Sequence, residues 1–168
     1  PGWRDEQVDV AFVKETSRFI AEHRKQPFFV YLALSAPHTP HVQPYFVKNK
    51  SDAGPRGDMV LEVDWAVGQI KKNLERFNLL ENTVIIITSD NGAEERNYDR
   101  ETRSFTGPTY GHKSNYIFRG QKADIFEGGH RVPFIVSWPG MIPEGQQTDK
   151  ILCFTDIFPT IAGLFNES

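Results

Sequence analysis

Thr83-Val84-Ile85-Ile86-Ile87-Thr88 is the stretch that decides the fold class, because four consecutive β-branched apolar residues leave it no polar face. Such a run predicts a short strand buried on both faces. Two more runs of the same character predict two further strands. They read Phe28-Phe29-Val30-Tyr31-Leu32-Ala33-Leu34 and Pro133-Phe134-Ile135-Val136-Ser137-Trp138.

Helical periodicity surrounds these strands. The segment 5–24 carries apolar residues at spacings of three, four and seven, and 58–77 carries a longer stripe of the same period. A short helix is expected up to Leu164, with Thr155 or Asp156 as its N-cap. Strands without a wet face that alternate with helices predict an α/β fold, with a parallel sheet covered by helices.

The composition is that of an ordinary globular protein. The 168 residues are 39% hydrophobic and 24% charged, which excludes disorder as the main state. The net charge of −3 gives no reason to expect a nucleic-acid or membrane partner, and the longest apolar run, 28–34, is too short to cross a bilayer. The single cysteine, Cys153, excludes an internal disulfide and a cysteine-based zinc site, and it is expected in the core.

Chemically capable side chains follow two of the predicted strands. Ser35-Ala36-Pro37-His38-Thr39-Pro40-His41 follows the first, and Ser89-Asp90-Asn91-Gly92 follows the second. Ligands of such sheets bind beyond the carboxyl ends of the strands, so both motifs are expected at one edge. Asp90 and Asn91 offer the oxygens that Ca²⁺ or Mg²⁺ prefers, although the same motif is also good turn chemistry. Calcium takes about 6–8 oxygens, so two residues would leave most of the ligands elsewhere.

Three further residues are candidates for a site, and each also has a structural interpretation. Prolines on both sides restrict the backbone of His38, whose ring either faces a ligand or caps a neighbouring backbone group. Lys122 lies in a glycine-bounded loop and is either an anion-binding charge or a solvated lysine. His112 either faces a substrate or is structural. Glu127 and Arg131, four residues apart, are expected to pair and brace the adjoining loop.

The order and wording of four segments resemble the sulfatase family, and together they cover nearly the whole chain. They correspond to the family's histidine loop, its metal-binding strand end, its lysine loop with the following strand, and a recurring helix start. In this sequence they read Phe28-Phe29-Val30-Tyr31-Leu32-Ala33 with Ala36-Pro37-His38-Thr39-Pro40, Val84-Ile85-Ile86-Ile87-Thr88-Ser89-Asp90-Asn91-Gly92, Arg119-Gly120-Gln121-Lys122 with Phe126-Glu127-Gly128-Gly129-His130-Arg131-Val132-Pro133 and Trp138-Pro139-Gly140, and Asp156-Ile157-Phe158-Pro159-Thr160.

The resemblance implies an alkaline-phosphatase-like three-layer sandwich, incomplete here, in which helices flank a mostly parallel sheet. It also implies calcium-dependent hydrolysis of sulfate esters by a formylglycine, which is made from Cys or Ser in a C/S-x-P/A-x-R motif. By matched motif, Asp90 and Asn91 would be calcium ligands, His38 would be the general acid, and Lys122 would bind the sulfate. A proton donor and fixed cations stabilise the charge that builds on the leaving oxygen.

The chain departs from the family because neither Cys153 nor any serine is followed by the residues of that motif. The paired acidic residues that complete the calcium site and the carboxy-terminal subdomain are also missing. Residues 1–168 are therefore expected to be the middle-to-late part of a sulfatase catalytic domain, without a second domain and inactive when isolated.

Two alternatives stay open. A phosphatase or phosphonate hydrolase of the same superfamily is the nearer one, although its two-zinc members tend to place Asp-His where this chain has Asp90-Asn91. A non-catalytic binding module or pseudoenzyme is the other, against which the intact His38 and Lys122 argue.

The resemblance implies a sulfate ester as the substrate. The polar and cationic loop 93–116 favours a sulfated polysaccharide among these esters, although a solvated loop would look the same. Its cationic candidates are Arg96, Arg100, Arg103 and His112. By resemblance, the protein is expected to be periplasmic, secreted or lysosomal. The sequence does not indicate an oligomeric state.

Overall fold

A computed structural model of the chain describes residues 2–94, 97–99, 104–106 and 110–164, so Arg96, Arg100 and Arg103 lie outside the described residues. The elements in chain order are η1 (Asp5–Gln7), α1 (Val8–His23), α2 (Gly54–Arg76), η2 (Leu80–Asn82), β1 (Ile85–Thr88), β2 (Asn97–Asp99), β3 (Ser104–Thr106), α3 (Glu127–His130), β4 (Phe134–Ser137), η3 (Phe154–Asp156) and α4 (Ile157–Leu164).

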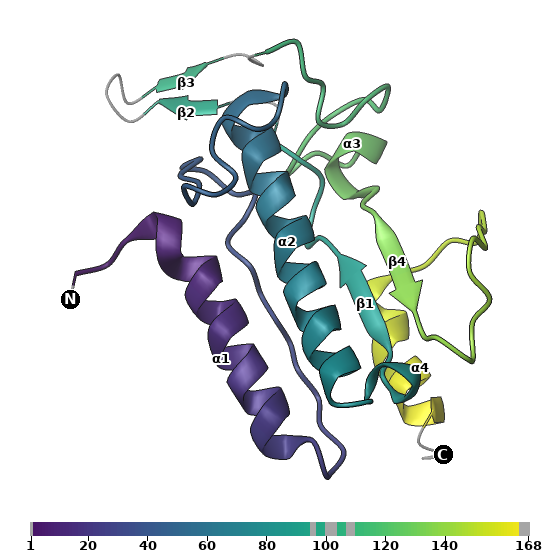
Figure 1. The fold of residues 1–168 in the computed structure, drawn as a ribbon. Coiled ribbons are helices and arrows are strands. Elements are labelled where there is room, and N and C mark those ends of the chain that lie inside the picture. The colour runs from purple at the N-terminus through teal and green to yellow at the C-terminus, as the bar shows by residue number, and fades with distance from the viewer. Residues whose placement is uncertain (1, 95–96, 100–103, 107–109, 165–168) are drawn as a thin grey trace.

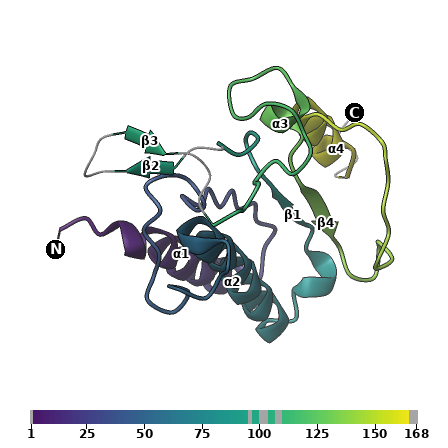
Figure 2. The ribbon, with the colours of Figure 1, turned by 90° about the horizontal axis from the view of Figure 1, so that it is seen from above.

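Strands β1 and β4 form a middle layer between helices. In Figure 2 they lie between the pair α1 and α2 on one side and α4 on the other. Helices on both faces of a strand layer are the arrangement of an α/β fold. The α/β class expected from the sequence is therefore confirmed.

The core lies where α1 packs on α2 (Figure 1). Val13 and Ile20 on α1, and Met59, Ala66 and Leu74 on α2, are all at most 4% exposed. Members of each set recur at intervals of seven or eight residues, which places them on one face of each helix. Each large side chain among them contributes about 2 kcal/mol on burial, so this contact fixes the two helices together.

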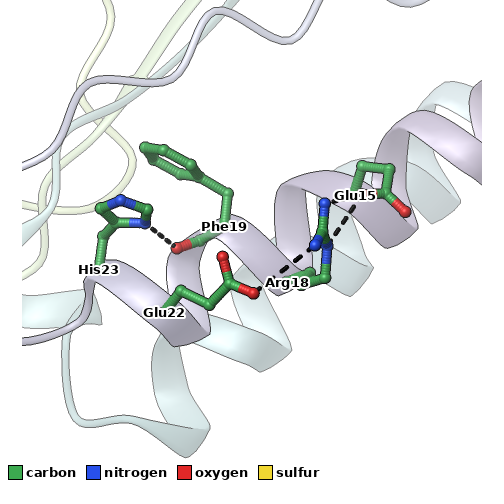
Figure 3. A network of polar contacts seen from close by, with 5 residues as sticks. All are labelled: Glu15, Arg18, Phe19, Glu22 and His23. Atoms are coloured by element: carbon green, nitrogen blue, oxygen red, sulfur yellow. Dashed lines mark hydrogen bonds and ion pairs between the residues drawn. The ribbon is translucent and has the colours of Figure 1, made fainter.

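The opposite face of α1 carries only local polar contacts (Figure 3). Arg18 forms ion pairs with Glu15 at 2.6 Å and Glu22 at 3.7 Å, and His23 Nδ1 is 2.9 Å from the carbonyl oxygen of Phe19. Exposed pairs of this spacing contribute roughly 0.3–0.5 kcal/mol each. They therefore support the helix without deciding where it packs.

The observed strand pairing is antiparallel and differs from the parallel pairing expected from the sequence. Strand β1 pairs antiparallel with β4, so that Ile85 faces Ser137 and Thr88 faces Phe134, and β2 and β3 form a second antiparallel pair. The mostly parallel sheet expected from the sequence is thus wrong for the strand pairs of the described residues. An apolar run indicates that a strand is buried, but it does not determine the direction of the neighbouring strand.

The first predicted strand is extended but unpaired. Residues 28–34 bond to no strand in the part of the chain that the structure describes. In Figure 1 this segment and β1 run in the same direction. Phe29 and Tyr31 are 71% and 83% exposed, whereas Phe28, Val30 and Leu32 are half-buried. The expectation of a strand buried on both faces is therefore wrong: one face is covered and the other is open.

The last helix, α4, begins at Ile157, as an N-cap at Asp156 would predict, but a 3-10 turn over Phe154–Asp156 leads directly into it. The side chain of Asp156 accepts a hydrogen bond from the backbone N–H of Cys153 at 2.8 Å, which makes it the third residue of a capping box rather than the N-cap. Cys153 occupies the capping position, and it is exposed instead of buried in the core. Within the described ranges, no helix combines the length and apolarity needed to cross a membrane.

Candidate active site

His38 and Lys122 lie together although 84 positions separate them in the chain. Nζ of Lys122 is 3.3 Å from Nε2 of His38. The backbone N–H of Lys122 donates to the carbonyl oxygen of Ala93 at 3.2 Å, and Ala93 follows the β1 motif directly. The structure therefore confirms that the loops after the first extended segment and after β1 meet at one edge.

A main-chain contact orients the ring of His38. Nδ1 lies 2.6 Å from the carbonyl oxygen of Thr39. Because a carbonyl oxygen only accepts, Nδ1 must carry the hydrogen, and the neutral ring then presents its lone pair at Nε2. The ammonium group of Lys122 donates to that lone pair, whereas a protonated ring would present an N–H there. Nε2 is thus the atom that can exchange a proton in this site.

Main-chain hydrogen bonds tie the loop after β1 to the lysine loop. The N–H of Gly92 donates to Gly129 at 2.8 Å, and the N–H of Gly128 donates to Arg119 at 2.8 Å. A Cβ atom on Gly92 would overlap the carbonyl oxygen of Gly128, so only glycine allows this approach. This close packing of main chain against main chain fixes the position of the backbone from which the Lys122 side chain extends.

Asn115 joins the same two loops and is a residue that sequence reasoning missed. Its Oδ1 accepts from the N–H of Ala93 at 3.0 Å, and its Nδ2 donates to the carbonyl oxygens of Ala93 at 2.9 Å and Gly120 at 3.2 Å. The side chain is 8% exposed. In sequence it is one polar residue within a polar loop, so no local signal distinguishes it.

Asp90 and Asn91 stand at the end of β1 with oxygens of the kind that calcium prefers. Asp90 Oδ1 accepts from the N–H of Asn91 at 3.0 Å, and Asn91 Nδ2 donates to the carbonyl oxygen of Gly92 at 3.0 Å. These bonds use Oδ1 of Asp90 and Nδ2 of Asn91, so that Oδ2 of Asp90 and Oδ1 of Asn91 are the oxygens that could bind a metal ion. The described ranges hold no cluster of three His, Cys, Asp or Glu residues suited to a metal. The donor types therefore fit calcium, and the number of donors falls short.

His41 is a second histidine on the same loop as His38. Nε of Arg56 is 3.4 Å from Nε2 of His41, and Nη1 of Arg56 donates to Ser114 Oγ at 2.6 Å. Burial, with smaller contributions from the positive charge of Arg56 and from that of His38 when its ring is protonated, lowers the pKa of His41 to about 4. His41 is therefore neutral near pH 7 and accepts from Arg56, which links the histidine loop to Ser114.

His112 is exposed, and within the described residues it forms no hydrogen bond with His38 or Lys122. Its predicted contact with a substrate stays a prediction. The expected pair of Glu127 and Arg131 is confirmed at 2.8 Å. Arg131 also lies over the ring of Phe118, 4.7 Å from its centroid, so the pair braces the loop that precedes β4.

A family model described as Sulfatase matches residues 2–167. An N-acetylgalactosamine-6-O-sulfatase of Bacteroides thetaiotaomicron is 34% identical over 167 residues, which are 98% of this chain and 32% of that protein. Human steryl-sulfatase is 40% identical over 150 residues, which are 89% of this chain and 25% of that protein. The chain thus spans a third or less of the length of these relatives.

Two solved structures have a similar fold. One, described under the metabolism of multiple glycosaminoglycans by Bacteroides thetaiotaomicron, has a TM-score of 0.87 and 33% identity, and the match covers 99% of this chain and 34% of that chain. The other, Ps i-CgsB in complex with k-i-k-neocarrahexaose, has a TM-score of 0.74 and 29% identity, and covers 96% and 34%.

Proposed function

Because the chain belongs to the sulfatase family, we propose that the whole protein hydrolyses sulfate esters and that this chain supplies His38, Lys122, Asp90 and Asn91 to its active site. The 3.3 Å contact between Lys122 Nζ and His38 Nε2 carries the proposal. It joins a potential proton donor to a fixed positive charge, next to the loop that bears Asp90 and Asn91. A sulfate monoester, with an anionic group and an oxygen that must be protonated, requires this combination.

Hydrolysis converts R–O–SO₃⁻ and water into R–OH and sulfate, and negative charge builds on the oxygen of R as the S–O bond breaks. In its protonated form, with an N–H at both ring nitrogens, His38 gives the Nε2 proton to that oxygen and becomes the neutral ring, while the contact between Nδ1 and Thr39 keeps the ring in place. Lys122 contacts a sulfate oxygen and neutralises charge in the transition state. The site therefore stabilises both groups that separate.

Asp90 and Asn91 would hold a calcium ion together with oxygens from other parts of the protein. When bound there, calcium would supply positive charge that stabilises an anionic substrate. The described donors fit this ion in type, as the oxygens left by the hydrogen bonds of Asp90 and Asn91 show. The family's formylglycine supplies the nucleophile, and we assign it to the remainder of the protein because these 168 residues contain no C/S-x-P/A-x-R motif.

A sulfated carbohydrate is the proposed substrate. One relative is named for a sulfated sugar, and one similar structure is a complex with an oligosaccharide of the carrageenan type. The loop that bears His112 is exposed, and Tyr110 and Tyr116 in it are 64% and 74% exposed. Polar and aromatic side chains at that place suit a sugar chain. For the same family-based reason we propose a periplasmic, secreted or lysosomal location.

The test uses the whole protein with a sulfated oligosaccharide, an aryl sulfate and the matching phosphate esters. We expect calcium-dependent release of sulfate that is lost in Lys122→Met. Faster release of phosphate than of sulfate would make the protein a phosphatase of the same superfamily. Binding of the oligosaccharide without release of either anion would make it a binding module or pseudoenzyme.

A further inference from the structure

Asp9 holds the backbone just before His38. Its Oδ1 accepts from the N–H of Ser35 at 2.7 Å and from Ser35 Oγ at 3.0 Å, and its Oδ2 accepts from the N–H of Ala36 at 2.8 Å. The N–H of His38 donates back to the carbonyl oxygen of Ser35 at 2.9 Å. Three hydrogen bonds from one carboxylate thus fix the turn that carries the histidine.

The carboxylate comes from α1, far from this turn in the sequence, and it is 1% exposed. Burial of a carboxylate is costly unless hydrogen bonds replace its water, and bonds to an ionised acceptor are stronger than neutral ones. Val13 and Ile20, on the same face of α1, anchor the helix in the core. The position of the turn is therefore set by a rigid helix.

We propose that Asp9 is a positioning residue for His38, keeping Nε2 directed at Lys122 and the leaving oxygen. Asp9 does not touch the substrate, and it acts through Ser35 and Ala36. The inference rests on the proposed function, because it assigns a role relative to the proton transfer by His38. A misplacement of about 1 Å in such a group can reduce the rate about 100-fold.

The chain contains a matched control. Asp58 on α2 is also 1% exposed, and its oxygens accept from the backbone N–H groups of Asn49 at 2.7 Å, Lys50 at 2.9 Å and Ser51 at 2.8 Å. Burial, charge and the number of bonds are the same as for Asp9. The clamped segment leads into α2 and does not carry the histidine. Asp9→Asn and Asp58→Asn should therefore lower stability in the same way, and only the first should move His38.

The experiment compares the two variants in the whole protein on two substrates, well below both melting temperatures. The leaving group of a sugar sulfate is a strongly basic alkoxide that must be protonated. The leaving group of 4-nitrophenyl sulfate is 4-nitrophenolate, a stable anion that needs little help from a proton donor. For Asp9→Asn we expect kcat to fall about 10–100-fold on the sugar sulfate and less than about fivefold on the aryl sulfate, with KM nearly unchanged. For Asp58→Asn we expect equal effects on both substrates, within about threefold.

Equal losses of Asp9→Asn on both substrates, or losses no larger than those of Asp58→Asn, would overturn the inference. If Asp9→Asn does not fold, Ser35→Ala serves instead, because it removes one of the three bonds at an exposed side chain. It should show the same selectivity at about two- to fivefold, and no selectivity would again overturn the inference. A wild-type protein that cleaves neither ester would overturn the proposed function instead, so the two failures are distinguishable.

Discussion

Glu62 on α2 lies beside Asp9 on α1, and the two residues are 3% and 1% exposed where the helices pack. Burial, with a smaller contribution from the negative charge of Asp9, raises the pKa of Glu62 from 4.5 to about 7. A neutral acid at this place avoids a second buried charge next to the carboxylate that clamps the histidine loop. The pH dependence of stability should therefore contain a contribution from Glu62.

The folded protein binds the Glu62 proton more tightly than the unfolded chain. Its contribution therefore lowers the free energy of unfolding as the pH rises from 4.5 to about 7, by roughly 3 kcal/mol in all. We expect Glu62→Gln to match the wild type near pH 4.5 and to be more stable by up to that amount near pH 8. Denaturant titrations at several pH values measure the difference.

Glu75→Gln is the control for this titration, because Glu75 lies on the same helix with an exposed side chain. It should leave the slope of stability against pH unchanged. An identical slope in Glu62→Gln and the wild type would show that Glu62 does not titrate in this window.

Asn115→Ala should loosen the lysine loop. It leaves the half-buried N–H and carbonyl groups of Ala93 without their side-chain partner, at a cost of about 1–3 kcal/mol. We expect a lower melting temperature and a fall in kcat of about tenfold or more, because the loop that carries Lys122 is no longer held in place. Asn73→Ala removes two hydrogen bonds of Nδ2 on α2, and it should lower stability while leaving kcat unchanged. Equal activity in both variants would contradict the role of Asn115.

Gly92→Ala should be strongly destabilising, because the new methyl group would overlap the carbonyl oxygen of Gly128. Overpacking of this kind costs about 1–3 kcal/mol, and the shift it forces should also reduce activity. Gly68→Ala introduces the same atom at a helical position with no atom within 4 Å of it. That variant should gain about 0.5–1 kcal/mol in unfolding experiments. A well-folded, fully active Gly92→Ala would show that the backbone contact is dispensable.

Lys122→Met should slow the hydrolysis of a sugar sulfate and of an aryl sulfate by similar factors, about 100–1,000-fold. The sulfate group that we propose Lys122 contacts is common to both substrates. His38→Ala should instead act mainly on the sugar sulfate, because only that leaving group needs the proton. Steady-state rates for both esters separate the two roles. A loss in Lys122→Met that is confined to the sugar sulfate would contradict the proposed role of Lys122.

That the loops after residues 28–34 and after β1 lie at one edge was predictable, because apolar runs followed by polar loops mark the ends of strands. The contact of Lys122 with His38 was not predictable in this way, since Lys122 follows no predicted strand. The ion pair of Arg131 with Glu127 was also predictable from local sequence, because the two residues are four positions apart. Antiparallel pairing of β1 with β4 was not predictable, because hydrogen-bond direction leaves no trace in an apolar run.

The side chains that hold the site in place were also missed. Asp9 acts on Ser35 and Ala36 through the folding of α1 against the loop, and its neighbours in sequence are those of any amphipathic helix. Asn115 acts on Ala93, 22 residues away. Their contacts exist only after the chain has folded, so a reading of local pattern cannot find them.

The main-chain bonds that join Gly92 to Gly129 and Lys122 to Ala93 allow substitutions at nearby exposed positions. Apart from Gly92 and Asn115, a framework built from N–H and carbonyl groups places few demands on the side chains around it. Ile117 and Ile125 flank this framework and are 76% and 87% exposed. Such positions can be randomised in a selection for new sulfate esters while the charged groups stay where they are. Substitutions at Ile117 and Ile125 can therefore change the exposed surface beside this framework without removing the main-chain bonds that hold it.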